Sequence, residues 1–372
     1  MEKKMKHSVP DVMGEALNLV RKSDVAGATA VIREALAGEQ ARSRSGLPEA
    51  WPGRPPEGVL APRRPLGEVL RALRARPAMP PSAPTELEPT HDFGERLLKR
   101  VYHGPAGSLG YRLYMPADAE RRDLALVLML HGCTQNPEDF ALGTQMNSLA
   151  DEFGLIVAYP RQPRRANASG CWNWFDPRHQ GRGSGEPARL AGLAQTLANE
   201  FGVGRERIFA AGLSAGGAMA EVLAGTYPDV FAAIGVHSGL PYQSAVDVPS
   251  AFAAMKGAAA RESAPPVAGG RRCRKIIIHG LADTTVHPAN GGRILDQAER
   301  GERLKRTDVD WQTEAGRISR TVLENAEGRP LIEHWQVEGG GHAWFGGDPR
   351  GSYTQAVGLD ASRVMVRFFL CL

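Results

Sequence analysis

The chain is poor in cysteine. Its 372 residues include only Cys133, Cys171, Cys273 and Cys371, which are too few for a disulfide scaffold in a chain of this length. No two of them have the CxxC spacing of a structural zinc site. We therefore expect neither a disulfide-built fold nor a zinc module.

Long apolar runs are missing as well. No stretch of about 18 uncharged apolar residues occurs, so we expect no membrane span. Residues 1–24 carry positive charges, but they have neither the uninterrupted apolar stretch nor the small-residue cleavage site of a signal peptide. These features predict a cytoplasmic protein.

Positive charge is not concentrated in the body of the chain. The formal net charge is +4, and residues 40–84 alone contribute eight Arg against three Glu. The remainder is therefore close to neutral, whereas recognition of nucleic-acid phosphates needs a clustered basic face. We expect no nucleic-acid partner.

The amino-terminal quarter differs from the rest. In residues 1–39 apolar positions recur at helical spacing in two segments, which predicts a helical hairpin with Ser23 capping its second helix. The hairpin either packs within this chain or docks to a partner or a granule surface. Residues 40–94 contain eleven prolines, all between positions 48 and 89, which is typical of an extended linker.

From residue 95 to residue 372, short apolar runs alternate with amphipathic segments. This pattern predicts an α/β fold, with a mostly parallel central sheet and helices on both faces. The expected strands cover residues 124–132, 155–160, 207–214, 232–239 and 275–280. Helices are expected over 137–154, 186–202 and 216–231, then a strand pair over 318–328 and 329–341 and a closing helix over 361–370.

The pentapeptide GLSAG places Ser214 between an expected strand and an expected helix. A nucleophile elbow needs such a tight turn with little side-chain bulk, so that the serine hydroxyl stands above the sheet edge. Gly212, Ala215 and Gly216 supply that clearance. A packing turn of small residues is the alternative, but the position between strand and helix favours Ser214 as a nucleophile.

A serine nucleophile needs a histidine base that an acid holds in one tautomer, and the acid is expected to come first in the chain. Asp283 follows an expected strand and is the natural acid, with a turn or cap aspartate as the alternative. His342 follows three glycines at the end of a later strand and is the best base. His279 and His287 lie beside Asp283 and compete for that role, but we interpret them as supporting histidines.

An oxyanion hole combines the backbone N–H after the nucleophile with one from the loop after an earlier central strand. Ala215 provides the first group. The segment LMLHGCTQN provides the second, because Gly132 lets the chain turn and the amide of Cys133 follows it. His131 either supports this loop by hydrogen bonding or is a buried histidine without catalytic effect.

Several ordered motifs resemble one family, and they are LHGCTQNPEDFA, SGCWNWF, GLSAGGAMA, TYPDVFAAIGVHSGL, IHGLADTTVHPAN, GGGHAW, GDPRGSY and DASRVMVRFF. Together they are similar to the polyhydroxybutyrate depolymerase family of esterases, relatives of feruloyl and acetylxylan esterases with the α/β-hydrolase fold. The resemblance covers about residues 95–372. It implies Ser214, Asp283 and His342 as a catalytic triad, with Cys133 beside the oxyanion hole.

The resemblance implies a serine carboxylic-ester hydrolase that works through an acyl-enzyme without a cofactor, most simply on poly- or oligo-3-hydroxybutyrate-type esters. A feruloyl or acetylxylan esterase is the close alternative, and a non-catalytic binding protein is the distant one. Secreted members of such families commonly begin with a signal peptide, which this sequence lacks. This departure favours an intracellular substrate over extracellular polymer digestion, although the family resemblance leaves an extracellular location open beside the cytoplasmic one.

Two further expectations follow from the motifs. Cys133 and Cys171 both lie in family-like segments, and they form a disulfide in an oxidising compartment or remain thiols in a reducing one. Trp172, Trp174 and Trp344 either line an apolar acyl pocket as substrate-binding residues or belong to the core.

Overall fold

The computed structural model describes residues 96–372, apart from 121–122, 259–271 and 301–302. The predicted hairpin over 1–39 and the predicted linker over 40–94 both lie outside the described residues.

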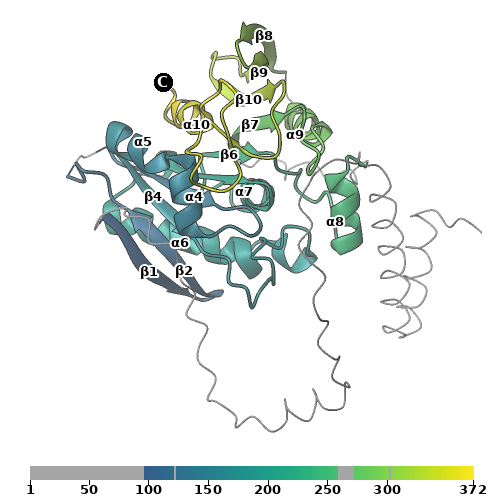
Figure 1. Ribbon diagram of the computed structural model, residues 1–372. Coiled ribbons are helices and arrows are strands. Elements are labelled where there is room, and N and C mark those ends of the chain that lie inside the picture. Colours follow the sequence, from purple (N-terminus) through teal and green to yellow (C-terminus); the bar gives the residue numbers. More distant parts are fainter. Residues whose placement is uncertain (1–95, 121–122, 259–271, 301–302) are drawn as a thin grey trace, which may run out of the picture. The chain divides into compact units, whose positions relative to one another are not determined.

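A ten-stranded sheet forms the centre of the described fold (Figure 1). Its strand order is β1-β2-β4-β3-β5-β6-β7-β10-β9-β8. The neighbours from β4 to β10 pair in parallel, and antiparallel strands complete both edges. The bounds are β1 Leu97–Gly104, β2 Gly107–Tyr114, β3 Ala125–Leu130, β4 Leu155–Pro160, β5 Ile208–Leu213, β6 Ala233–His237, β7 Arg274–Gly280, β8 Lys305–Thr313, β9 Gly316–Glu324 and β10 Pro330–Val337.

Helices cover both faces of this sheet, as the sequence predicts for parallel strands that are apolar on both sides. One core lies between the sheet and α6, α7 and α9, and the other lies between the sheet and α4, α5 and α10. The bounds are α4 Pro137–Thr144, α5 Met146–Phe153, α6 Gly185–Phe201, α7 Ala215–Thr226, α8 Val248–Met255, α9 Ala289–Glu299 and α10 Ala361–Leu370. Two short 3-10 helices, η2 Pro177–His179 and η3 Arg205–Arg207, flank α6. A two-stranded sheet of β11 Trp344–Phe345 and β12 Thr354–Gln355 follows β10.

The expectation of one helix over 137–154 is wrong. The chain forms α4 and α5 instead, because Gln145 adopts a left-handed conformation with φ of 53° and ends the first helix.

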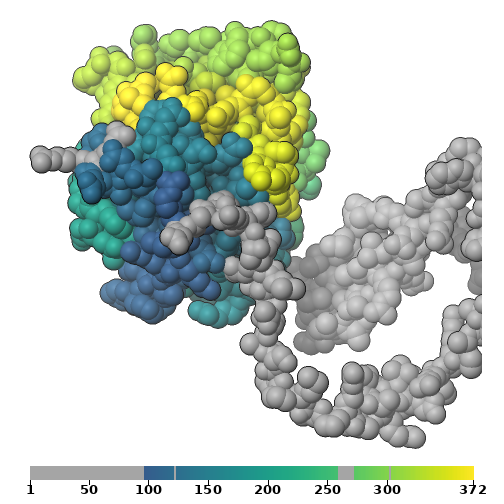
Figure 2. Space-filling model, turned by 60° about the vertical axis from the view of Figure 1, so that its left-hand side comes forward, coloured from purple at the N-terminus to yellow at the C-terminus, as the bar shows by residue number. Residues whose placement is uncertain are grey.

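Figure 2 shows α10, in yellow, beside α5, in blue. Here Arg363 of α10 forms an ion pair with Glu152 of α5 (Nη1–Oε1 2.8 Å).

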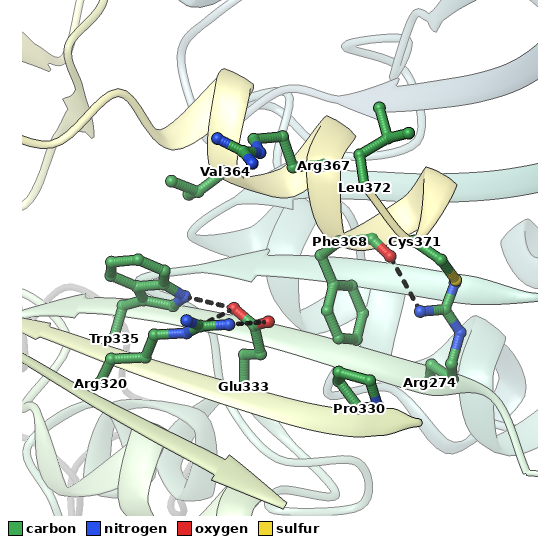
Figure 3. Close-up of a pocket in the computed structure, with 10 residues that line it drawn as sticks. All are labelled: Arg274, Arg320, Pro330, Glu333, Trp335, Val364, Arg367, Phe368, Cys371 and Leu372. Carbon is green, nitrogen blue, oxygen red and sulfur yellow. Dashed lines mark hydrogen bonds and ion pairs between the residues drawn. The ribbon is translucent and has the colours of Figure 1, made fainter. Parts of the chain in front are cut away.

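A cavity of ≈ 360 Å³ lies at the amino-terminal ends of β7 and β10 (Figure 3). On its wall, the guanidinium of Arg274 donates to the carbonyls of Phe368 and Phe369, each at 2.8 Å. These carbonyls belong to the last turn of α10, where the helix does not supply all the donors that its terminal carbonyls need; that of Phe368 also accepts from the amide of Cys371 at 3.3 Å. Arg274 therefore fastens the closing helix to the sheet, at the end of the strands opposite to Asp283 and His342.

Candidate active site

Ser214 occupies the sharp turn between β5 and α7. Its φ of 57° and ψ of −118° lie in a region that residues other than glycine rarely adopt. The amide of Ser214 donates to the carbonyl of His237 in the neighbouring strand β6, at 2.9 Å. The surrounding strands thus hold a strained serine at the start of a helix, which is the geometry of a nucleophile elbow.

The glycines of the pentapeptide are needed because backbone atoms approach them closely. A Cβ atom on Gly212 would lie 2.4 Å from the carbonyl carbon of Gly216. A Cβ atom on Gly216 would lie 2.0 Å from the carbonyl oxygen of Leu130 in β3. Neither backbone group can move aside cheaply, so both glycines let β3, β5 and α7 meet beneath Ser214.

Asp283 lies in the loop after β7, and its carboxylate is fixed at both oxygens. Oδ1 accepts hydrogen bonds from the amides of Thr285 (2.9 Å) and Val286 (2.8 Å). Oδ2 lies 2.7 Å from Nδ1 of His342. The structure therefore brings together the acid and the base that the sequence predicts.

The protonation states of this pair suit a general base. Burial by itself would raise the pKa of Asp283, but hydrogen bonds from His279 and His342 outweigh it, so the pKa lies below its usual range. An ionised carboxylate only accepts, so Nδ1 of His342 carries the proton. The lone pair on Nε2 of His342 is then free to take a proton from a nucleophile.

Two glycines allow the acid loop and the base loop to cross. A Cβ atom on Gly280 would lie 2.2 Å from the carbonyl oxygen of Gly340. The same carbonyl accepts a hydrogen bond from the amide of Ala282 at 2.9 Å. This close crossing is what brings Asp283, just past β7, to His342, just past β10.

Ser214 and His342 stand at the same edge of the sheet, because each follows the carboxyl end of a parallel strand. Their side chains form no hydrogen bond with one another within the described structure; such contacts often tighten only when substrate binds. His237 connects their surroundings: its carbonyl accepts from Ser214, and its Nε2 accepts from the amide of Phe345 at 3.3 Å. Burial lowers the pKa of His237 well below its ordinary value, so this connecting ring is neutral.

The expected oxyanion amides lie next to the elbow. A Cβ atom on Gly132 would lie 3.7 Å from Cβ of Ser214, which places the start of the Cys133 loop against the serine. The amide of Gly132 is itself occupied, since it donates to Oε1 of Gln135 at 2.9 Å. In the described part of the chain, the amides of Cys133 and Ala215 donate to no other group, so both can bind a developing oxyanion.

The sequence left two interpretations of His131, a support for this loop or a buried histidine without catalytic effect. The structure shows that its ring supports the loop by hydrogen bonding. Its Nε2 accepts from the amide of Gln162 at 3.2 Å, and its Nδ1 lies 2.8 Å from the carbonyl of Gly132. Burial lowers the pKa of His131 to about 4. The ring is therefore neutral, with its proton on Nδ1.

The sequence left open whether Cys133 and Cys171 are thiols or a disulfide, and the structure pairs them in a disulfide. Cys133 and Cys171 are joined with a Cα–Cα distance of 4.2 Å. The bond ties the oxyanion loop to the segment that carries Trp172 and Trp174.

The three tryptophans are packed in the core. Trp172 and Trp344 are less than 2% exposed, and Trp174 is 5% exposed. The indole N–H of Trp172 donates to the carbonyl of His131 (3.1 Å), and that of Trp344 donates to Oγ of Ser362 (3.0 Å). Each indole has a packing role, and substrate contact stays a prediction.

Tyr353 is a residue at this edge that the sequence analysis did not single out. Its hydroxyl lies 3.2 Å from Oγ1 of Thr134 in the oxyanion loop, and its carbonyl accepts from the amide of Trp344 in the base loop. The side chain is 46% exposed. It thus stands beside the loops that carry Cys133 and His342, with an exposed surface; the motif GDPRGSY was the signal for it.

Within the described ranges, no three His, Cys, Asp or Glu side chains are grouped so that they could hold a metal ion. None of the helices that the structure describes is both long and apolar enough to cross a membrane.

Comparison with known proteins gives one family. A family model described as Esterase PHB depolymerase matches residues 109–316. Poly(3-hydroxyalkanoate) depolymerase C of Paucimonas lemoignei is 32% identical over 257 residues, which are 66% of this chain and 58% of that protein. Feruloyl esterase B of Neurospora crassa is 32% identical over 46% of this chain and 63% of its own length.

The chain thus spans about three fifths of the length of these relatives. Among solved structures, the acetyl xylan esterase from Aspergillus awamori is similar over 73% of this chain and 98% of its own, with a TM-score of 0.56 and 20% sequence identity. That likeness shows the fold, which is the predicted α/β-hydrolase fold.

Proposed function

Because this chain belongs to the esterase PHB depolymerase family, we propose that it is a carboxylic-ester hydrolase that works through a covalent acyl-serine. The observation that carries the proposal is a strained serine at a strand-to-helix turn, on the sheet edge where Asp283 and His342 are hydrogen bonded at 2.7 Å. An acid–base pair and an exposed hydroxyl at one edge are what acyl transfer requires.

In the proposed reaction, Oγ of Ser214 attacks the ester carbonyl carbon while Nε2 of His342 takes its proton. The amides of Cys133 and Ala215 stabilise the oxyanion of the tetrahedral intermediate. His342 then gives the proton to the departing alkoxide, and the acyl group stays on Ser214. Water, deprotonated by His342, attacks the acyl-serine and releases the acid, and the proton returns to Ser214.

We propose short 3-hydroxyacyl esters, as oligomers or amorphous polymer, as the substrates. The similarity to a poly(3-hydroxyalkanoate) depolymerase supports this choice. Feruloyl esters and acetylated xylan are the second candidate, supported by the feruloyl esterase and by Probable acetylxylan esterase A of Aspergillus fumigatus, which is 28% identical over 53% of this chain and 59% of its own length. Specificity constants for hydroxybutyrate oligomers, methyl ferulate and acetylated xylose, measured under one set of conditions, separate the two. A clear preference for ferulate or acetylated sugar would assign the enzyme to the second class.

The cytoplasmic location stays a prediction, and the disulfide between Cys133 and Cys171 argues against it, because disulfides persist mainly in oxidising compartments. We therefore favour an oxidising compartment. Thiol labelling of the protein from its native source tests this: only the thiols of Cys273 and Cys371 should be available after unfolding. Labelling of four thiols would support the cytoplasm.

The first experiment is hydrolysis of a short-chain aryl ester with and without a serine-directed organophosphate. We expect turnover that the organophosphate abolishes. The absence of turnover by the folded full-length chain on every ester class named above would favour the non-catalytic binding protein.

A further inference from the structure

The ring of His279, at the end of β7, lies against the loop that carries the proposed acid. Its Nε2 lies 2.8 Å from the carbonyl oxygen of Val286 and 3.5 Å from Oδ2 of Asp283. Both neighbours are acceptors, so Nε2 carries a proton. The side chain is 1% exposed, so this contact is sheltered from water.

Val286 links the ring to the carboxylate. Its carbonyl accepts from His279, and its amide donates to Oδ1 of Asp283 at 2.8 Å. A shift of Val286 would therefore displace a hydrogen-bond donor to Asp283, the carboxylate that is hydrogen bonded to Nδ1 of His342. His287, in the same loop, has no such connection; its ring accepts from the amide of Ala289.

The other side of the ring faces helix α9 at a glycine. A Cβ atom on Gly291 would lie 3.1 Å from Nδ1 of His279 and 2.9 Å from Nε2 of His334, on the neighbouring strand β10. Both nitrogens are buried, and neither has a hydrogen-bond partner in the described structure. Because Gly291 has no side chain, α9 can pack directly against the imidazole rings of His279 and His334.

The titratable groups around His279 come from three other places. Asp283 faces it from the acid loop, His334 from β10 and His237 from β6, and His342 lies beyond the carboxylate. Burial lowers the pKa of His334 to about 4 and that of His237 well below its ordinary value. These two rings are neutral near pH 7, so among these neighbours from the acid loop, β10 and β6 in the described structure, Asp283 is the charged one.

We propose that His279 is a positioning residue for the reaction: through Val286 it holds the acid loop so that Asp283 meets His342, and Gly291 provides the space its ring needs. The inference rests on the proposed function, because it assumes that the Asp283–His342 pair is the catalytic acid and base.

Two substitutions in α9 test the positioning role of His279 while leaving every imidazole ring in place. Gly291→Ala should lower kcat/KM for a short aryl ester about tenfold, mostly through kcat, because the added methyl group displaces the ring and misplacements of about 1 Å can cost up to about a hundredfold. Gly292→Ala is the matched control, since a Cβ atom there meets nothing within 4 Å. It should leave kcat/KM within about twofold of the wild type. Equal activity of the two variants would overturn the proposal.

Substitution of the ring gives a second test. His279→Leu should lower kcat/KM and move the acid limb of its pH profile to lower pH, because a less well-aimed carboxylate stabilises the protonated base less. His279→Gln, whose amide can still donate to Val286, should restore part of the activity, and His287→Gln should change neither quantity. A Leu variant with wild-type activity and pH profile would overturn the proposal.

Ser214→Ala is measured in the same assay. If it stays active, the proposed function fails. If it is inactive while Gly291→Ala and His279→Leu match the wild type, only the role of His279 fails.

Discussion

The strained backbone of Ser214, the proposed nucleophile, depends on the absence of side chains at the neighbouring glycines. At Ser214 the backbone is in an unusual conformation, and such strain persists only where the surroundings over-determine it. Gly212 and Gly216 do this by letting backbone from β3 and α7 come within a distance that no side chain would allow. The chemistry of the hydroxyl is therefore coupled to the packing of its neighbours.

Gly216→Ala tests that coupling. The added methyl group would meet the carbonyl oxygen of Leu130 at 2.0 Å, so we expect a loss of about 1–3 kcal/mol in the free energy of unfolding, as for an overpacked core, and near-complete loss of ester hydrolysis. Urea denaturation and an aryl ester assay measure the two quantities. Gly110→Ala is the control, because a Cβ atom at that position meets nothing within 4 Å. Wild-type stability and activity in the Gly216 variant would contradict this account of the elbow.

Asp283 should contribute to stability in a pH-dependent way. Its pKa is lowered in the folded state, so its stabilising contribution is fully present above the unfolded value of about 3.9 and is lost as the pH falls through the folded value. The difference in unfolding free energy between the wild type and Asp283→Asn should therefore be largest near neutral pH and shrink below about pH 4. Urea titrations at several pH values measure it. A difference that grows on acidification would have the wrong sign.

At the scale of elements, the central strands could be predicted closely because parallel strands covered on both faces are continuous apolar runs. The segment expected as a strand over 155–160 is β4 with the same bounds, and the others agree within about two residues. Edge elements could not be predicted in this way. Nearly every residue of β8 is exposed, so the strand lacks the continuous apolar run that marks the central strands; only Val309 and Trp311 alternate with polar residues.

The residues of the candidate site also fall into those that could be predicted from the sequence and those that could not. The placement of Ser214, Asp283 and His342 at one sheet edge could be predicted because each follows a strand that the sequence shows clearly. His237 ends a predicted strand, but its contacts with Ser214 and Phe345, like the position of Tyr353, depend on segments from distant parts of the chain that meet at the sheet edge, and no local pattern reports such a meeting. The burial of Trp172 and Trp344 is likewise a property of tertiary packing, which the sequence left open.

The disulfide is the covalent connection between two of these loops. It joins residues 38 positions apart, so Cys171→Ser should lower the free energy of unfolding by about 3–4 kcal/mol, mainly by releasing the unfolded chain. Activity should fall as well, because the loop that carries the Cys133 amide loses its fastening. Thermal unfolding and the aryl ester assay test both effects. Cys371→Ser, which removes an exposed free thiol, is the control and should behave like the wild type.

At the scale of the whole molecule, the proline-rich composition of residues 40–94 predicts a linker between the amino-terminal segment and the hydrolase fold. Deletion of residues 1–90 should therefore leave kcat/KM for small soluble esters within about twofold of the full-length value. Activity on particulate polymer is the quantity that a docking role of the amino-terminal segment would change. A truncated chain that fails to fold or loses small-ester activity would show that residues 1–90 pack on the catalytic fold.

The central claim is that Ser214 forms a covalent intermediate. Mass spectrometry of the full-length protein after treatment with a serine-directed organophosphate tests it most directly, with peptide mapping to locate the label. We predict one adduct per chain, on the peptide that contains Ser214, with activity lost in proportion to labelling and no adduct in Ser214→Ala. An active enzyme that takes up no label, or a label on another residue that accounts for the inactivation, would contradict the account.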